Sequence, residues 1–296
     1  MLRYDRVSFV YPGTTKPVSA LEGYDLTVEA GEPVSLIGPS GCGKSTSLFL
    51  AAGLLQPTIG QVLVAGEKVE KPRLSTALIL QDFGLLPWKT VFENAALGLR
   101  IRDFPKDERL RRTENALAQV GLSEFARMYP HELSGGMRQR LALARTLALD
   151  VDLMLMDEPL SSLDALLRES LQDVLLGLWR SRGYAQVLVT HSIEEAVFLG
   201  RRIVVMSPRP GCVSHIIENP AMGSTDYRGT EEFYRTCQQV RLLLHQDDER
   251  VVDKTTPTVT TNDVVVDKAM PAAGDNRVVG TEIGTQVINS EVATDA

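Results

Sequence analysis

A short glycine-rich segment constrains this chain more than any other part of its sequence. Residues 38–46 read G-P-S-G-C-G-K-S-T, and they lie between an apolar run at 34–37 and a helix-length stretch at 45–55. Glycines let the backbone curl so that its N–H groups converge on phosphate oxygens, with the positive end of the following helix behind them. The sequence therefore predicts a strand, a phosphate-binding loop and a helix.

Individual positions of this P-loop suit particular contacts with ATP. Lys44 can reach the β and γ phosphates, Ser45 can ligate Mg²⁺ through its hydroxyl group, and Thr46 can bond an inner phosphate. The other predicted nucleotide contacts are Gly38, Pro39, Ser40, Gly41, Cys42 and Gly43. Cys42 is expected to be a small filler whose thiol a bound nucleotide would protect. An idle glycine turn is the alternative, and the flanking strand and helix argue against it.

A pair of acidic residues follows a second apolar run, at 153–156. Asp157 and Glu158 are expected to emerge at the edge of the sheet where α/β folds bind their ligands. Adjacent acids there can divide the work: Asp157 would hold Mg²⁺, and Glu158 would polarise the attacking water as general base. A solvated acidic turn is the alternative, and the P-loop upstream favours the chemical interpretation.

The alternation of strands and helices predicts the architecture around these motifs. Strands are expected at 2–9, 21–28, 34–37, 60–64, 77–80, 153–156, 187–190, 203–206 and 213–217. Strands that alternate with helices imply a mostly parallel sheet. We therefore expect an α/β fold with a P-loop NTPase core, an N-terminal antiparallel β subdomain and a helical insert at about 88–150.

The second half of the chain carries two further helical patterns. Apolar residues at three- and four-residue spacing form a stripe typical of a core-facing helix: Leu163, Leu166, Leu167, Leu171, Val174, Leu175 and Leu178. A last amphipathic helix is expected around 233–244. Residues 246–296 contain no aromatic residue and are expected to form a flexible tail, with a weak strand at their valine pairs as the alternative.

Composition narrows the class of partner. The 296 residues include 38 acids and 31 bases, for a net charge of −7, so no large positive field exists to attract nucleic acid. Three cysteines without paired spacing fit a reducing compartment. No apolar run approaches the roughly 18 to 20 residues that span a bilayer. We expect an intracellular protein, and any membrane role would have to come through a partner.

The segment L-S-G-G-M-R-Q at 133–139, between the P-loop and D-E-P, makes the chain resemble the ATP-binding cassette family. The resemblance covers about residues 1–245 and implies an ATPase domain that acts as a head-to-tail dimer. Ser134, Gly135 and Gly136 of one copy would close over ATP held by the P-loop of the other. Hydroxyl and amide groups at a helix start suit a γ-phosphate, and an ordinary helix cap is the alternative.

The resemblance assigns further positions one at a time. Gln81 matches a residue that contacts Mg²⁺ and the attacking water and that couples the ATP site to a membrane subunit. Asp164 in S-S-L-D matches the acid of a loop at the dimer interface, although Ser162 stands where the family often has alanine. His191 matches the switch histidine at the γ-phosphate, where a lone histidine would otherwise be structural. Tyr11 matches the aromatic residue that stacks on adenine.

These assignments define two expected groups of site residues. The catalytic group is Glu158, His191, Gln81 and Lys44. The Mg²⁺ ligands are Ser45, Gln81 and Asp157.

Two segments resemble the nitrate, sulfonate and taurine importer group within the family. They are L-L-P-W-K-T-V-F-E-N-A-A-L-G-L after Gln81 and H-S-I-E-E-A-V-F-L after the strand at 187–190. The resemblance implies an ATP-binding, ATP-hydrolysing subunit that powers import of such a small solute, peripheral to the cytoplasmic face of the cell membrane. A permease and a solute-binding protein, rather than this chain, would select the solute.

The implied partners are a second copy of the chain, permease subunits and, through the complex, a solute-binding protein, with no nucleic acid. Residues 85–88, L-L-P-W, would lie beside the groove that receives a permease helix; the alternative is that they belong to the core of the insert. A soluble cassette ATPase in translation or DNA repair is the alternative function. The single cassette, the short insert and the acidic charge argue against it.

Overall fold

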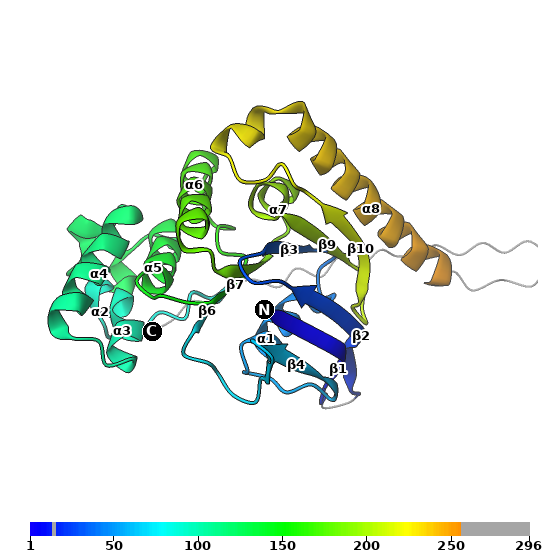
Figure 1. Ribbon diagram of the computed structural model, residues 1–296, viewed down its shortest axis with the longest axis horizontal. Coiled ribbons are helices and arrows are strands. Elements are labelled where there is room, and N and C mark those ends of the chain that lie inside the picture. Colours follow the sequence, from blue (N-terminus) through cyan, green and yellow to red (C-terminus); the bar gives the residue numbers. More distant parts are fainter. Residues whose placement is uncertain (14–15, 256–296) are drawn as a thin grey trace, which may run out of the picture. The chain divides into compact units, whose positions relative to one another are not determined.

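Two sheets organise the computed structural model, which describes residues 1–13 and 16–255 (Figure 1). The larger sheet has the strand order β10-β9-β3-β8-β7-β6. Its strands are β3 (Pro33–Ile37), β6 (Thr76–Ile79), β7 (Leu153–Asp157), β8 (Ala185–Val189), β9 (Arg202–Met206) and β10 (Val213–Glu218). Neighbouring strands from β9 to β6 are parallel, and β10 pairs antiparallel with β9. The predicted mostly parallel sheet is confirmed.

The parallel strands end at one common edge of this sheet. Along that edge, the loops that follow β9, β3, β8, β7 and β6 succeed one another in this order. Strands β3, β7 and β8 are buried on both faces, as expected of a sheet covered by helices. The edge therefore gathers segments far apart in sequence, and it is the edge where α/β folds bind ligands.

The smaller sheet contains the N-terminal strands and confirms the predicted antiparallel subdomain. Its order is β2-β1-β4-β5, with antiparallel pairing throughout. Its strands are β1 (Leu2–Tyr11), β2 (Val18–Val28), β4 (Ile59–Val64) and β5 (Glu67–Lys68). The Tyr4 hydroxyl donates to the carbonyl of Ser47 at 2.9 Å, which ties β1 to the helix α1 (Lys44–Ala51) after the P-loop.

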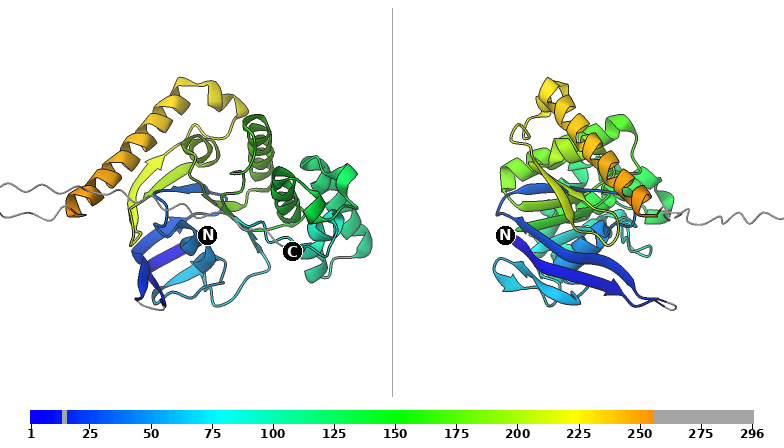
Figure 2. Two further views of the ribbon diagram at one scale, coloured as in Figure 1. Left: turned by 180° about the vertical axis from the view of Figure 1, so that it is seen from behind. Right: turned by 90° about the vertical axis from the view of Figure 1, so that its right-hand side faces the viewer.

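Helices between β6 and β7 form the predicted insert. They are α2 (Val91–Ala95), α3 (Leu97–Ile101), α4 (Lys106–Gln119) and α5 (Gly135–Leu147). Figures 1 and 2 show them gathered beside β6 and β7, at the end of the larger sheet opposite β10. Leu99, Leu117 and Leu141 belong to one hydrophobic cluster in which these helices pack against the larger sheet.

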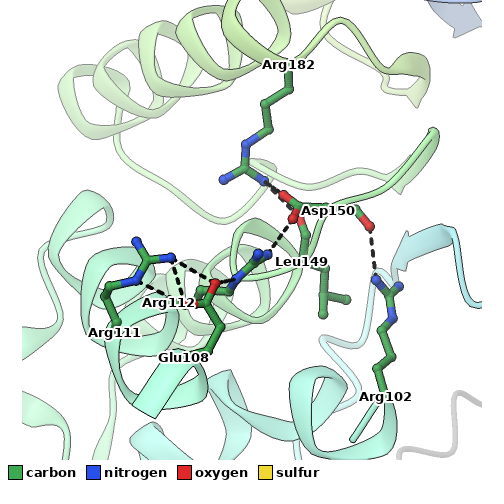
Figure 3. A network of polar contacts seen from close by, with 7 residues as sticks. All are labelled: Arg102, Glu108, Arg111, Arg112, Leu149, Asp150 and Arg182. Atoms are coloured by element: carbon green, nitrogen blue, oxygen red, sulfur yellow. Dashed lines mark hydrogen bonds and ion pairs between the residues drawn. The ribbon is translucent and has the colours of Figure 1, made fainter. Parts of the chain in front are cut away.

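A polar network around Asp150 joins the insert to the rest of the fold (Figure 3). Arg112 Nη1 donates to Asp150 Oδ2 at 2.5 Å, and Arg102 Nη1 donates to the Asp150 carbonyl at 3.0 Å. Arg182, at the end of α6, donates to the carbonyl of Leu149 at 2.7 Å. One short segment after α5 thus receives arginines from the insert and from a helix of the core.

Helix α6 (Ala165–Arg182) carries the predicted leucine stripe, with one exception. Leu171 and Leu175 are buried, whereas Leu166 is 83% exposed. Leu166 lies in the first turn of α6, where its neighbours are exposed as well. Helical spacing predicts which side of a helix faces inward, but not where the packed neighbours end, so the prediction is wrong for Leu166.

The C-terminal part of the described chain contains α7 (Ile193–Leu199) and α8 (Glu231–Thr255). Phe233, Cys237 and Val240 are buried, as the amphipathic pattern predicts. Helix α8 continues past residue 246, where the tail was expected to begin, and the remainder of that predicted tail, 256–296, lies outside the described residues. None of the helices within 1–13 and 16–255 is long and apolar enough to cross a membrane.

Candidate active site

The loop between β3 and α1 takes its shape from glycine and from one lysine. Gly43 has φ +99°, and a Cβ at this position would lie 2.8 Å from the carbonyl oxygen of Ala20. Only glycine fits such a position without a shift of the backbone. Lys44 Nζ donates to the carbonyls of Gly38 and Pro39 at 2.8 and 2.9 Å. The lysine therefore fastens the start of the loop to its end.

The N-terminus of α1 has no side-chain cap, because its N-cap residue is Gly43. Other helices of the chain are capped by side chains, including α5 by Ser134, α6 by Asp164 and α7 by Ser192. The first-turn N–H groups of α1 thus have no side-chain acceptor, and the positive end of the helix dipole faces the loop. This arrangement suits a bound phosphate.

A cavity of about 390 Å³ opens over this loop. The predicted site residues in its lining are Tyr11, Ser40, Gly41, Gly43, Lys44, Ser45, Thr46, Gln81 and Glu158. The volume suits a small-molecule ligand, since ligand cavities measure roughly 300 to 1,000 Å³. The fold therefore brings the P-loop, the loop after β6, the acid after β7 and an aromatic residue from the smaller sheet around one space.

Tyr11 forms part of the cavity wall at the end of β1. Its hydroxyl lies 3.2 Å from Thr46 Oγ1, and its ring packs edge-to-face on Phe9 at 4.8 Å between centroids. Phe9 is buried, whereas Tyr11 is 36% exposed. Phe9 thus supports the ring of Tyr11, which keeps an accessible aromatic surface at the cavity.

Asp157 and Ser45 form a donor pair that fits a magnesium ion completed by phosphate oxygens. Asp157 is 3% exposed, and its desolvation raises the pKa of the carboxyl group, partly offset by a hydrogen bond from Ser45. Within the described ranges, no group of three or more His, Cys, Asp or Glu side chains could hold a metal alone. Mg²⁺ is commonly held by one or two carboxylates together with substrate phosphates, so the residues present fit this ion.

Glu158 and His191 meet at the ends of the neighbouring strands β7 and β8. The carboxylate Oε2 of Glu158 lies 3.3 Å from Nδ1 of His191. Glu158 has φ +50°, in the left-handed region that non-glycine residues seldom adopt. Such backbone strain persists only where surrounding contacts enforce it, and it concentrates at functional sites.

A buried glutamate shapes the loop that carries His191. Thr190 Oγ1 donates to the carboxylate of Glu195 and accepts the N–H of Ser192 at 3.1 Å. Burial raises the pKa of Glu195 to about 7, against the lowering effects of the Thr190 hydrogen bond and of Arg168 and His191. Glu195 was not among the predicted site residues.

Gln139 on α5 connects two predicted site segments; it ends the segment L-S-G-G-M-R-Q but was not among the predicted site residues. Its Nε2 donates to the carbonyl of Glu158 at 3.3 Å, and its Oε1 accepts the Ser162 hydroxyl at 2.6 Å. Gln139 is 1% exposed. The hydroxyl of Ser162, at the position where the family often has alanine, thus supplies a hydrogen bond that alanine could not make.

Arg145 holds the loop after Gln81 through backbone carbonyls. Its Nη2 donates to Phe83 at 2.7 Å and its Nη1 to Gly84 at 2.6 Å. Desolvation lowers the pKa of this guanidinium group. Phe83 has φ +63°, so the arginine stabilises a backbone turn that its residue type disfavours. Nothing in the spacing of the motifs points to Arg145.

Several predicted site residues do not line the cavity. Cys42 is buried beneath the loop, 3.7 Å from Lys44 Nζ, and its thiol pKa is raised by burial. Ser134 is exposed at the start of α5, where its Oγ accepts the Met137 N–H at 3.3 Å. Asp164 caps α6 in the same way. The further predicted residues outside the lining are Gly38, Pro39, Gly135, Gly136, Asp157 and His191.

This fold and this site define a P-loop nucleoside triphosphatase with a helical insert. A family model described as ABC transporter matches residues 21–161. An uncharacterized ABC transporter ATP-binding protein of Methanocaldococcus jannaschii is 41% identical over 217 residues, 73% of this chain and 81% of that one. The chain belongs to the ABC transporter family and is an ATP-binding ATPase.

Other relatives carry more specific names. The taurine import ATP-binding protein TauB of Roseobacter denitrificans is 46% identical over 194 residues, 66% of this chain and 72% of that one. The taurine import ATP-binding protein TauB of Chromobacterium violaceum is 45% identical over 219 residues, which are 74% of this chain and 83% of that one. A solved dimeric structure of a bacterial ABC transporter cassette aligns with a TM-score of 0.69 at 32% identity, over 74% of this chain and 98% of that chain.

Proposed function

We propose that this chain is the ATP-hydrolysing subunit of a membrane importer for a small sulfonate of the taurine type. One observation carries the proposal: a single cavity is lined by the P-loop, Gln81 and Glu158, which come from three separate strand ends. The import names of relatives at 45% and 46% identity support the solute class. A role in translation or DNA repair is not favoured.

The residues in and beside the cavity have distinct proposed tasks. Lys44 and the first-turn N–H groups of α1 bind the phosphates. Glu158 orients the attacking water and takes its proton, Gln81 positions that water, and His191 contacts the γ-phosphate. Bound Mg²⁺, held by Ser45, Asp157 and Gln81, would neutralise phosphate charge. The edge-to-face packing of Tyr11 on Phe9 leaves an accessible ring surface at the cavity, which supports contact with the adenine ring.

We also propose that two copies assemble head to tail, so that the start of α5 in one copy caps ATP in the other. Ser134, Gly135 and Gly136 lie outside the cavity of their own chain, as this assembly requires. The exposed Leu166, two residues after Asp164, supplies an apolar contact beside the proposed interface. A solved cassette of similar fold is described as dimeric.

The proposed partners at the membrane are permease subunits, with a solute-binding protein reached through them and the chain peripheral to the cytoplasmic face. Residues 85–88 support a contact with the permease. Leu85 packs partly into the core, whereas Trp88 is 70% exposed. An indole group that exposed suits an interface with another protein.

Two measurements test this function. Detergent extraction of membranes with the tagged chain should recover permease subunits together with it, and recovery of ribosomal or DNA-repair proteins instead would contradict the importer. Sedimentation of the purified chain should detect a dimer when ATP is added to the Glu158→Gln variant. ATP hydrolysis at full specific rate by a strict monomer would exclude the shared site.

A further inference from the structure

An arginine from outside every predicted motif lies at the nucleotide cavity. Arg209 belongs to the loop 207–212 between β9 and β10, and it forms part of the cavity lining. Its side chain is exposed, and it makes no hydrogen bond or ion pair with any other residue in the described ranges. Besides Arg209, the only cationic side chain in this lining is that of Lys44. Among the residues that the structure describes, nothing occupies this guanidinium group, which is therefore available to a ligand.

The position of Arg209 is set by backbone contacts around Gly211. The Gly211 N–H donates to the carbonyl of Ala20 at 2.9 Å, and its carbonyl accepts the Glu22 N–H at 3.2 Å. A Cβ on Gly211 would lie 1.8 Å from the carbonyl oxygen of Cys42, so the loop packs backbone against backbone on the P-loop. Arg209 thus belongs to a loop that backbone hydrogen bonds hold against the P-loop.

The strand order places Arg209 on one particular side of the P-loop. β9 and β3 are neighbours (Figure 1), so the loop that follows β9, which carries Arg209, lies beside the P-loop, which follows β3. His191, Glu158 and Gln81 follow β8, β7 and β6, on the other side of the P-loop. The P-loop therefore separates Arg209 from the residues proposed to act on the γ-phosphate. On its own side, the cavity wall comes from Tyr11, Val18 and Ala20.

We propose that Arg209 is a nucleotide-binding residue whose guanidinium group contacts the portion common to ATP and ADP, at the α-phosphate and ribose. The inference rests on the proposed nucleotide site and adds a second cation to it. Charge-assisted hydrogen bonds from guanidinium to phosphate oxygens are among the stronger polar interactions of proteins. Because the γ-phosphate lies at the opposite end, Arg209 contributes equally to the binding of both nucleotides.

The test compares Arg209→Ala with Arg201→Ala by calorimetric titration of the full chain with MgATP and with MgADP. Arg201 is exposed at the other end of β9, and its side chain has no partner in the described chain, so the control removes the same charge away from the cavity. We expect Arg209→Ala to raise the Kd of both nucleotides by a similar factor of about ten. Arg201→Ala should leave both constants unchanged.

Other outcomes overturn the inference. If Arg209→Ala binds both nucleotides like the control, Arg209 does not contact them. If ATP binding weakens much more than ADP binding, Arg209 acts at the γ-phosphate. Arg209→Lys, which keeps the charge, should retain part of the affinity and provides a second reading if the alanine variant unfolds. A wild-type chain that binds ATP no better than Lys44→Ala would instead refute the nucleotide site itself.

Discussion

The Nδ1 atom of His191 lies 3.3 Å from a carboxylate oxygen of Glu158. The two side chains come from adjacent strand ends, and each has separate support. Gln139 donates to the carbonyl of Glu158, while Glu195 and Thr190 hold the loop of His191. The fold itself thus places the imidazole beside the carboxylate. We therefore expect the effects of substituting the two residues on ATP hydrolysis to be non-additive.

Glu158→Gln tests the proposed general base. The amide keeps the size of the side chain but cannot accept a proton from water, so we expect ATP hydrolysis to fall about 100-fold or more. ATP binding should persist because the proposed phosphate contacts of the P-loop are untouched. Phosphate release and nucleotide affinity are the measurements. Near-normal turnover in this variant would remove Glu158 from its assigned role.

Lys44→Ala tests the phosphate contact. Removal of the ammonium group deletes the cation proposed to bind the phosphates and also the hydrogen bonds to the carbonyls of Gly38 and Pro39. We expect the Kd for ATP to rise at least about tenfold. Lys68→Ala, which removes a lysine of the smaller sheet, is the control. Equal ATP affinity in the two variants would be the contrary result.

Arg145→Ala tests the clamp on the loop after Gln81. Two carbonyls lose their donor, so the loop should loosen and ATP hydrolysis should fall about tenfold while ATP affinity changes little. Arg140→Ala is a matched control, because Arg140 also lies on α5 and donates to backbone carbonyls, those of Val120 and Gly121. An equal loss of hydrolysis in both variants would indicate a general effect on α5.

The buried carboxyl group of Glu195 should make the free energy of unfolding depend on pH. Because burial raises its pKa from 4.5 to about 7, the folded state binds the proton more tightly than the unfolded state does. Protonation of Glu195 therefore stabilises the fold fully below pH 4.5. As the pH rises from 4.5 to about 7, the free energy of unfolding should fall by about 3 kcal/mol.

Urea unfolding at a series of pH values measures this dependence. Glu195→Gln cannot titrate at this position and should lack the corresponding slope. Glu194→Gln, at the exposed neighbouring position, should keep it. A Glu195→Gln variant with the same slope as the unmodified chain would show that another group is responsible.

Asp150→Asn tests the network between the insert and α6. Its carboxylate accepts from Arg112 and is largely exposed, so we expect a loss of about 1 kcal/mol in the free energy of unfolding, smaller in high salt. Glu70→Gln removes one partner of the exposed pair with Lys68 and should change the free energy by less than about 0.3 kcal/mol. Identical urea curves for Asp150→Asn and the unmodified chain would contradict the expectation.

The sequence predicts those features that local chemistry determines. The P-loop, its flanking strand and helix, and the antiparallel start follow from glycine spacing and apolar runs, and the structure confirms the fold. The tasks assigned to Ser134 and Asp164 stay predictions. Leu166 is exposed although it belongs to the predicted stripe. The helical spacing of apolar residues does not show where the elements packed against a helix end.

Residues that act through tertiary contacts escaped sequence reasoning for a different reason. Gln139, Arg145 and Arg209 donate to, or lie beside, segments distant in sequence. No spacing rule relates an arginine on α5 to the carbonyl of Gly84, because that pairing exists only after the strands have assembled. A single sequence therefore predicted the glycine-rich loop better than the side chains that support the candidate site.

Helix α5 begins at Gly135, beside the exposed Ser134, and carries Arg145 ten residues later, about 15 Å along its axis. Backbone hydrogen bonds run from turn to turn along this length. One continuous helix therefore carries both the serine proposed to cap ATP in the second copy and the arginine that donates to the carbonyls of Phe83 and Gly84. A shift of this helix as a body would move Ser134 and Arg145 together, and with Arg145 the turn that precedes Trp88.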